Sequence, residues 1–186
     1  MDKDIIRNEV IDTIIKRRTI REYEPRQITE KELNTLLNCA MWAPSGRNSQ
    51  PVHVRVLQDM DALKLINEDF KNLVGWDTPA YTRYETNPVY HNAPTVFFLF
   101  SDRECHMDAG IMTENICIAA ESLGLGTCII GSIGALMNAP EGRVWKKRMN
   151  IPEDWHFLIA IAVGYKAENP PPKPRDESHY QVIKKI

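Results

Sequence analysis

The sequence predicts an α+β fold built around one sheet. Helical and strand patterns are intermingled along the chain, and its first two helices follow each other directly, which argues against a regular winding of alternating strands and helices. The 186 residues contain no internal repeat, no flexible linker and no shift in composition. We therefore expect one domain over residues 1–186.

The chain begins with an amphipathic helix, expected over residues 4–15. Its apolar residues recur at the spacing of one helix face, at Ile5, Ile6, Val10, Ile11, Ile14 and Ile15. A second helix opens at the sequence TEKE, where Thr29 can cap the first turn while Glu32 reaches back to it. Its expected buried stripe comprises Leu33, Leu36, Leu37 and Ala40. Pro44 is expected to stop this helix.

Two strands and a third helix are predicted in the middle of the chain. In the sequence VHVRVL, residues 52–57, valines alternate with polar residues, which is typical of a half-buried strand. A helix is expected from about Met60 to Val74, because apolar residues there keep helical spacing. Its apolar positions are Leu63, Ile66, Phe70 and Leu73. The sequence TVFFLF, residues 95–100, indicates a strand that is buried on both faces.

The second half of the chain contains two more helices and two more strands. A helix expected over residues 108–123 is apolar almost all round, which is typical of the centre of a fold or of an oligomer. A short strand, TCII, precedes a helix expected over residues 138–149. The sequence FLIAIAVGY predicts a central strand, and the proline-rich tail ENPPPKPRDESHY is expected to be extended and not helical.

Composition indicates a soluble globular protein without a generic affinity for nucleic acid. The chain is 43% hydrophobic and 26% charged, and its net charge of −2 lacks the basic excess of nucleic-acid-binding proteins. The four cysteines include no CxxC pair, the N-terminus lacks the pattern of a signal peptide, and no apolar run is long enough to span a membrane. We therefore expect a cytoplasmic protein that binds no membrane and holds any anion locally.

Several motifs fail on the order or the identity of their residues. In GLGTCIIG, the glycines follow a helix and open a strand, which is the reverse of a dinucleotide-binding fingerprint, and no Gly-Lys-Ser/Thr of a P-loop follows. The five histidines include no HExxH and no close ligand pairing, so no metal site is expected. Nothing in the sequence places a base beside a cysteine, so a Cys–His hydrolase is unsupported.

A basic cluster over residues 16–21 follows the first helix and has two interpretations. Arg17, Arg18 and Arg21 can cap the helix, because a helix C-terminus carries a partial negative charge. They can also form a phosphate clamp together with Thr19, because guanidinium and hydroxyl groups donate hydrogen bonds to phosphate oxygens. The sequence leaves both interpretations open.

A second basic pair, Lys173 and Arg175, lies near the C-terminus in the sequence PKPR. Prolines restrict the backbone on this strut, so less conformational entropy is lost when the strut is ordered. Two basic groups so far apart in sequence can converge on one dianion in the fold. The sequence does not show whether they do.

The loop APSGRNSQP joins the second helix to the first strand. Prolines restrain both of its ends, and Gly46 allows a ligand to approach the backbone closely. Asn48 and Gln50 each offer a donor and an acceptor, which suits the edge of a heterocycle. A plain turn between helix and strand is the alternative, and loop asparagines are common.

Four stretches, in order, resemble the nitroreductase family of FMN-dependent oxidoreductases: RRTIREY, APSGRNSQP, GLGTCIIGSIG and PKPR. The resemblance extends from about Ile11 to Arg175. It implies an α+β fold with a mixed sheet flanked by helices, and an intertwined homodimer that binds FMN at its interface with residues from both chains. It also implies that the helix over residues 108–123 lies at the centre of the dimer.

The resemblance implies which residues hold the cofactor. Those expected at the FMN phosphate and ribityl chain are Arg17, Arg18, Thr19, Arg21, Lys173 and Arg175. Those expected along the flavin ring from the other subunit are Pro44, Ser45 and Gly46, with Asn48 and Gln50 bonded to polar atoms of the ring or the ribityl chain. Those expected to pack beside the isoalloxazine are Ile130, Gly131 and Ser132.

The implied activity is transfer of hydride from NADH or NADPH, through the flavin, to a nitroaromatic, quinone or similar flat acceptor by a ping-pong mechanism. FMN carries the chemistry, so no catalytic side chain is expected. In the irregular stretch 75–93, the aromatic residues Trp76, Tyr81, Tyr84 and Tyr90 are candidates for the substrate pocket, unless they pack on the core. The alternative functions are a dehalogenase, a desaturase, a flavin-fragmenting enzyme, or a non-catalytic flavin carrier or sensor.

Overall fold

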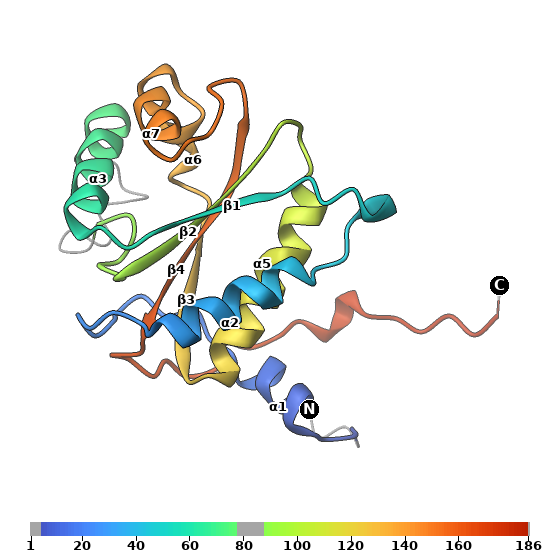
Figure 1. Ribbon diagram of the computed structural model, residues 1–186. Helices are drawn as coiled ribbons and strands as arrows, with labels where there is room; N and C mark the ends of the chain where they lie inside the picture. Colours follow the sequence, from blue (N-terminus) through green and yellow to red (C-terminus); the bar gives the residue numbers. More distant parts are fainter. Residues whose placement is uncertain (1–4, 78–87, 186) are drawn as a thin grey trace.

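The computed structural model describes residues 5–77 and 88–185 and has a four-stranded sheet at its centre (Figure 1). Its strands are β1 (His53–Leu57), β2 (Thr95–Ser101), β3 (Leu125–Ile130) and β4 (His156–Tyr165), in the order β1-β2-β4-β3. The three strand pairings are antiparallel, and an isolated parallel bridge joins Thr19 to Thr127. The expected α+β class is confirmed, and every predicted strand is present.

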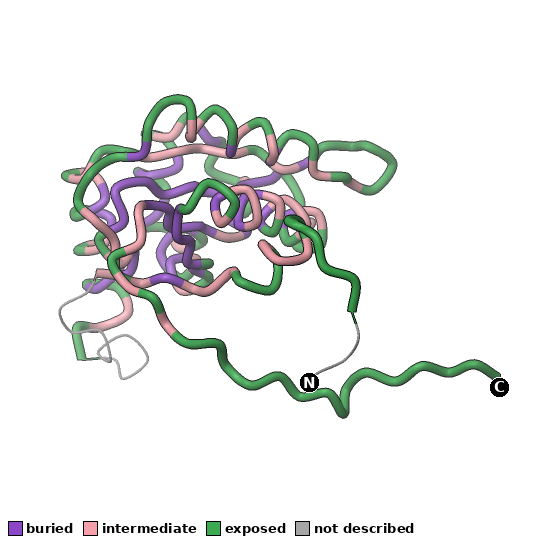
Figure 2. Tube along the Cα trace, turned by 90° about the horizontal axis from the view of Figure 1, so that it is seen from below, coloured by how far each residue is buried: buried purple, intermediate pink, exposed green. Residues whose placement is uncertain are grey.

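Helices cover both faces of the sheet (Figure 1). They are α1 (Glu9–Lys16), α2 (Glu30–Met41), α3 (Met60–Val74), α5 (His106–Ser122), α6 (Gly134–Met137) and α7 (Arg143–Arg148). One hydrophobic cluster joins α2 and α5 to one face, and a second cluster joins α3, α6 and α7 to the other. Figure 2 shows the buried residues concentrated between these layers. The helix α1 packs outside them, against α5.

The second and third helices agree with the sequence patterns. In α2, the Thr29 hydroxyl accepts a hydrogen bond from the Glu32 backbone N–H at 3.2 Å, and the Glu32 carboxylate accepts one from the Thr29 backbone N–H at 2.7 Å. The helix α3 has the expected bounds, but Leu73 is 39% exposed. Val74 packs against the core instead, because it lies four residues after the buried Phe70 and so continues that helix face.

Two predicted helices differ from the structure in their bounds. The first helix starts at Glu9, because Asn8 is extended and its side chain accepts a hydrogen bond from the Ile11 N–H at 2.9 Å. The helix expected over residues 138–149 is interrupted by a 3₁₀ turn, Pro140–Gly142, and α7 begins only at Arg143. Gly142 lies so close to the Leu136 carbonyl that a Cβ there would be 2.2 Å from its oxygen.

The C-terminal tail is mostly extended, as expected, and departs from the body of the fold (Figure 1). It contains one 3₁₀ turn, Glu177–His179, which Asp176 caps by accepting a hydrogen bond from the Ser178 N–H at 2.9 Å. Within the two described ranges, no helix is long and apolar enough to cross a membrane.

Several helices leave apolar side chains exposed. Val10 and Ile14 of α1 are 64% and 51% exposed, and Trp42, at the end of α2, is 81% exposed. A cavity of about 980 Å³ lies among α1, α2 and α5, beside these side chains. The apolar face of α1 therefore has no cover among the residues that the structure describes.

Candidate functional site

The residues expected to bind the cofactor form two groups in the fold. One group lies beside β3, where the segment after α1 runs next to that strand, and the Ile20 N–H donates to the Thr127 carbonyl at 2.9 Å. The other group lies on the loop before β1. Since β1 and β3 are the two edge strands, the groups are separated by the width of the sheet, about 14 Å.

Arg17 is a half-buried cation of the first group whose charge is poorly compensated. Its guanidinium is half-buried, and its Nη2 donates only to the Sγ of Cys117, at 3.7 Å. Its Nε is buried and has no hydrogen-bond partner. Within the described part of the chain, no carboxylate forms an ion pair with Arg17. A half-buried guanidinium in this condition is costly unless an anion binds it, so the position fits a phosphate.

Arg18 makes the contacts of a helix cap. Its Nη1 donates to the carbonyl oxygens of Ile15, Lys16 and Arg17 at 2.7, 3.0 and 2.9 Å. These carbonyls lie at the C-terminus of α1, where the partial negative charge of the helix is concentrated. For Arg18, the capping interpretation of the basic cluster therefore describes the contacts that the chain itself provides.

Arg17 and Arg21 lie near the same buried thiol. Burial raises the pKa of Cys128 to about 11, while the positive charges of Arg21 and Arg17 act against that rise. The backbone N–H of Arg21 donates a hydrogen bond to the Glu168 carboxylate, which belongs to the C-terminal segment. The fold thus brings two of the three arginines into one neighbourhood, next to a residue from the other end of the chain.

The end of β3 presents a different isoleucine from the one expected. Ile130 is buried in the cluster under α3 and α6, together with Cys128. Ile129 points to the opposite face, which β3 shares with α5, and it is 42% exposed. Gly131 is exposed, and Ser132 is half-buried. Strand alternation counted from Thr127 could have identified Ile129 as the residue available to a ligand on the Arg17 side.

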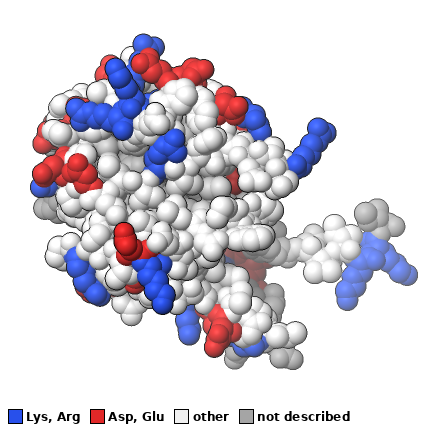
Figure 3. All heavy atoms as spheres, in the orientation of Figure 1, with Lys and Arg blue, Asp and Glu red and all other residues white. Residues whose placement is uncertain are grey.

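Lys173 and Arg175 are exposed on the C-terminal strut, and neither makes a hydrogen bond or an ion pair within the described residues. The three prolines before them line a cavity of about 530 Å³ together with Lys16 and Arg18. The strut therefore leaves the body of the fold beside the basic cluster. Figure 3 shows positive and negative side chains interspersed over the visible face.

The loop before β1 holds the second group in a defined conformation. The Gly46 N–H donates to Asp108 of α5 at 3.1 Å, and the Gln50 N–H donates to the Ser45 hydroxyl at 2.9 Å. The Gln50 side-chain amide donates to Asn48 at 3.3 Å. Arg47, Asn48 and Gln50 have φ angles of 55°, 53° and 46°, in the left-handed region. No side chain contact would block a ligand at Gly46, because a Cβ built there meets nothing within 4 Å.

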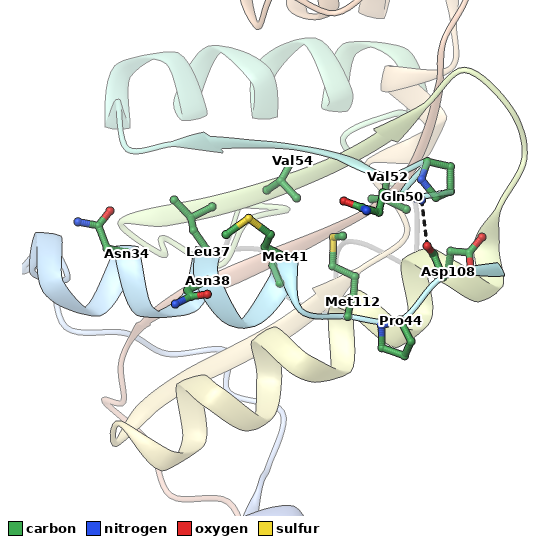
Figure 4. A pocket seen from close by; sticks show the side chains of 14 residues that line it. Asn34, Leu37, Asn38, Met41, Pro44, Gln50, Val52, Val54, Asp108 and Met112 are labelled. Atoms are coloured by element: carbon green, nitrogen blue, oxygen red, sulfur yellow. Dashed lines mark hydrogen bonds between the residues drawn. The ribbon is translucent and has the colours of Figure 1, made fainter. Parts of the chain in front are cut away.

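A cavity of about 590 Å³ lies behind this loop, between α2, β1 and α5 (Figure 4). Figure 4 shows the thioethers of Met41 and Met112 beside Leu37 and Val54 in this cavity. Among the described residues that line it, Asp108 is the only charged one, so the cavity favours apolar or uncharged groups over anions.

Within one chain, the two groups do not meet. Gly46 contacts Asp108 in the first turn of α5, whereas Arg17 contacts Cys117, about 13 Å further along the same helix. A ligand that touches both groups within one chain would therefore have to span at least this distance.

The two aromatic candidates within the described residues, Trp76 and Tyr90, lie at the end of α3 and in the core and not at either group. Trp76 is 56% exposed, and its indole N–H donates to Asn72 at 3.0 Å at the end of α3. Tyr90 is 1% exposed and belongs to the core, which agrees with the alternative that these aromatic residues pack on the core. Tyr81 and Tyr84 lie outside the described residues.

Within residues 5–77 and 88–185, no group of three His, Cys, Asp or Glu side chains is arranged to hold a metal ion.

Comparison with known proteins identifies relatives over most of the chain. Residues 14–165 match the family model described as the nitroreductase family. A protein of Archaeoglobus fulgidus provisionally named NADH dehydrogenase/NAD(P)H nitroreductase is 28% identical over 180 residues, covering 92% of this chain and 89% of its own. A Bacillus subtilis protein named FMN reductase, with NAD(P)H as donor, is 28% identical over 185 residues and covers 90% and 70%. The crystal structure of a nitroreductase with bound FMN from Bacteroides fragilis superposes with a TM-score of 0.84 at 28% identity, covering 96% of this chain and all of its own.

Proposed function

Because the chain belongs to the nitroreductase family, we propose that it is an FMN-dependent oxidoreductase that passes hydride from NADH or NADPH to a flat acceptor. The names of its relatives support a flavin oxidoreductase with a nicotinamide donor. We further propose that the acceptor is a nitroaromatic, a quinone or a similar conjugated electrophile, and that donor and acceptor use one position in turn, by a ping-pong mechanism. When bound, FMN would supply the redox chemistry, so no side chain is assigned a catalytic role.

The observation that supports this proposal most directly is that Arg17 is half-buried without an anionic partner among the described residues. Its guanidinium is half-buried, has a buried Nε without a partner and lacks a carboxylate in the described residues. A phosphate monoester would provide the missing acceptors through forked, charge-assisted hydrogen bonds. The proposed phosphate and ribityl contacts are Arg17, Arg18, Thr19, Arg21, Lys173 and Arg175. Of these, Arg18 would act mainly through its charge, since its Nη1 caps α1.

The residues proposed for the flavin ring come from both edges of the sheet. At the β3 edge they are Ile130, Gly131 and Ser132, to which the exposed Ile129 is added. At the β1 edge they are Pro44, Ser45, Gly46, Asn48 and Gln50. Hydrogen bonds from backbone N–H groups to the Asp108 and Ser45 side chains hold this loop in place before any ligand arrives, so little further ordering is needed on binding.

We propose that the working form is an intertwined homodimer, in which the loop of one copy completes the β3 side of the other. The exposed apolar residues of α1 and the end of α2, beside the cavity among α1, α2 and α5, provide a surface for the second copy. The C-terminal arm carries Tyr180, Val182 and Ile183, which are 84%, 80% and 67% exposed. An arm of this kind reaches beyond its own body and suits a partner's surface (Figure 1).

The proposal is tested by adding FMN to the purified protein, removing free flavin and recording the absorption spectrum. We expect a yellow protein that oxidises NADH or NADPH when a nitroarene or a quinone is supplied. A protein that remains colourless after incubation with FMN would contradict the proposed function. Bound FMN that neither nicotinamide reduces would instead indicate a flavin carrier or sensor.

A further inference from the structure

The two ends of the chain are joined side by side next to the proposed phosphate site. The Glu24 N–H donates to the Tyr165 carbonyl at 3.0 Å, and the Ala167 N–H donates to the Glu22 carbonyl at 3.0 Å. Between these two contacts, Tyr23 and Lys166 form an isolated antiparallel bridge. The segment that carries the arginines is therefore held against the segment that leads to the C-terminal strut.

Glu168 extends this junction by one contact that involves a side chain. Its carboxylate accepts a hydrogen bond from the backbone N–H of Arg21. Beyond Glu168, the chain continues through Asn169 and three prolines to Lys173, and none of these residues makes a hydrogen bond to the body within the described part of the chain. In that part of the chain, Glu168 is thus the last residue before the strut that is hydrogen-bonded to the body of the fold.

We propose that Glu168 is a positioning residue for the binding of the FMN phosphate, an inference that rests on the proposed function. The strut after it is stiff, because proline restricts φ and the preceding residue is confined to extended conformations. A stiff segment transmits the direction of its base over the roughly 15 Å that separate Glu168 from Lys173. By fixing that base to Arg21, the Glu168 carboxylate aims Lys173 and Arg175 at the same ligand as Arg17 and Arg21.

The charge of Glu168 makes this role distinguishable from an electrostatic one. A carboxylate beside Arg21 subtracts positive charge from a site for a dianion, so electrostatics alone predicts that its removal strengthens phosphate binding. Positioning predicts the opposite result, because loss of the acceptor leaves the Arg21 N–H unpaired and the strut free. The sign of the effect therefore separates the two roles.

The test compares Glu168→Ala and Glu168→Gln with the wild type in binding of FMN and of riboflavin, which lacks the phosphate. We expect the alanine variant to bind FMN roughly ten-fold more weakly, with riboflavin affinity changed less than about three-fold. Glutamine keeps an acceptor oxygen and removes the charge, so it should restore FMN affinity to the wild-type value or better. Glu22→Ala is the matched control, since Glu22 is an exposed carboxylate of the same segment whose side chain makes no hydrogen bond among the described residues.

Each outcome decides the proposal. FMN affinity in Glu168→Ala that equals or exceeds the wild-type affinity overturns it, and so does an equal loss for FMN and riboflavin. If the alanine variant does not fold, Glu168→Asp takes its place, because the shorter side chain withdraws the acceptor and keeps the charge; unchanged FMN affinity there overturns the proposal. A wild-type protein that binds neither flavin contradicts the proposed function itself, which is a separate result.

Discussion

The Nη2 of Arg17 lies 3.7 Å from the Sγ of Cys117, so the guanidinium of Arg17, which follows α1, packs against α5. This thiol does not neutralise the guanidinium. Burial raises the pKa of Cys117, so the group stays protonated and uncharged at neutral pH. The positive charge of Arg17 is therefore held in place by a neutral neighbour and remains available to a bound anion.

Replacing Arg17 should weaken FMN binding far more than replacing Arg18. Hydrogen bonds to a charged group contribute about 1.5–3 kcal/mol, so Arg17→Ala should lower FMN affinity roughly ten-fold to a hundred-fold. Arg18 already donates to three carbonyls of α1, and Arg18→Ala should mainly lower stability, by about 0.3–1 kcal/mol. Fluorescence titration of FMN and urea unfolding measure the two effects. Equal losses of FMN affinity in both variants would contradict the assignment.

The free energy of unfolding should decrease as the pH falls, because His91 binds a proton more readily in the unfolded state. Burial, with a further contribution from the positive charge of Arg21, lowers the pKa of His91 to about 4. The unfolded state has an ordinary pKa near 6.5 and therefore binds the proton first, so the folded state loses stability between about pH 6.5 and pH 4, by at most about 3 kcal/mol. Urea unfolding at pH 7 and at about pH 4.5 measures the loss.

The variant His91→Asn isolates this effect. His91 has a φ angle of 56°, and asparagine tolerates the left-handed region well, so the backbone should be preserved. The pH dependence over this window should become shallower in the variant. A slope identical to that of the wild type would show that other groups cause it.

The capping box of α2 should contribute measurably to stability. Thr29→Ala removes the acceptor of the Glu32 N–H and should cost about 1 kcal/mol in the free energy of unfolding. Thr35→Ala, in the exposed part of the same helix, is the control and should change stability by no more than about 0.5 kcal/mol. The prediction fails if both variants unfold at the same urea concentration.

Lys146 should be more important for stability than its neighbour Lys147. Its side chain is 5% exposed, and its Nζ donates to the carbonyls of Glu153 and Trp155 at 3.1 and 2.5 Å. Lys146→Met keeps much of the volume but leaves both carbonyls without this donor, at a cost of about 1–3 kcal/mol. Lys147→Met, at an exposed position, should stay within about 0.5 kcal/mol of the wild type. Thermal and urea unfolding both test this difference.

A charge on the apolar face of α1 should disrupt the proposed dimer. Ile14 is 51% exposed beside the cavity among α1, α2 and α5, and Ile14→Glu places a carboxylate where the second copy is proposed to pack. Leu65→Glu is the matched control, because Leu65 is 47% exposed on α3, which covers the other face of the sheet. Sedimentation velocity should show a monomer only for the α1 variant. A dimer that survives Ile14→Glu would place the interface elsewhere.

The elements with a strong local signal could be predicted from the sequence alone. The strand TVFFLF is buried throughout, and Thr29 and Glu32 form the expected reciprocal cap. Helix boundaries were harder to predict from the sequence where a single residue sets the start or the end of the helix. Asn8 starts α1 by accepting from the Ile11 N–H, although the apolar spacing begins before it. Gly142 packs against the end of α6, a tertiary contact that no local pattern contains.

The candidate site was predictable in its parts and not in its arrangement. The sequence marks Arg17 and Arg21 as a basic pair, but their nearness to Cys128 depends on how the segment after α1 runs beside β3. The distinction between Ile129 and Ile130 depends on the register of β3, which exchanges the two faces if it shifts by one residue. Glu168 had no signal in the sequence, because its role follows from one contact across the fold.

The separation of the loop at β1 from the arginines at β3 has a consequence for the proposed holoprotein. Each protomer of the proposed dimer would carry two half-sites that the other protomer completes, so retention of the flavin would depend on protein concentration. A solution diluted below the dissociation constant of the pair would release its pigment, and the yellow colour would then serve as a direct optical measure of assembly.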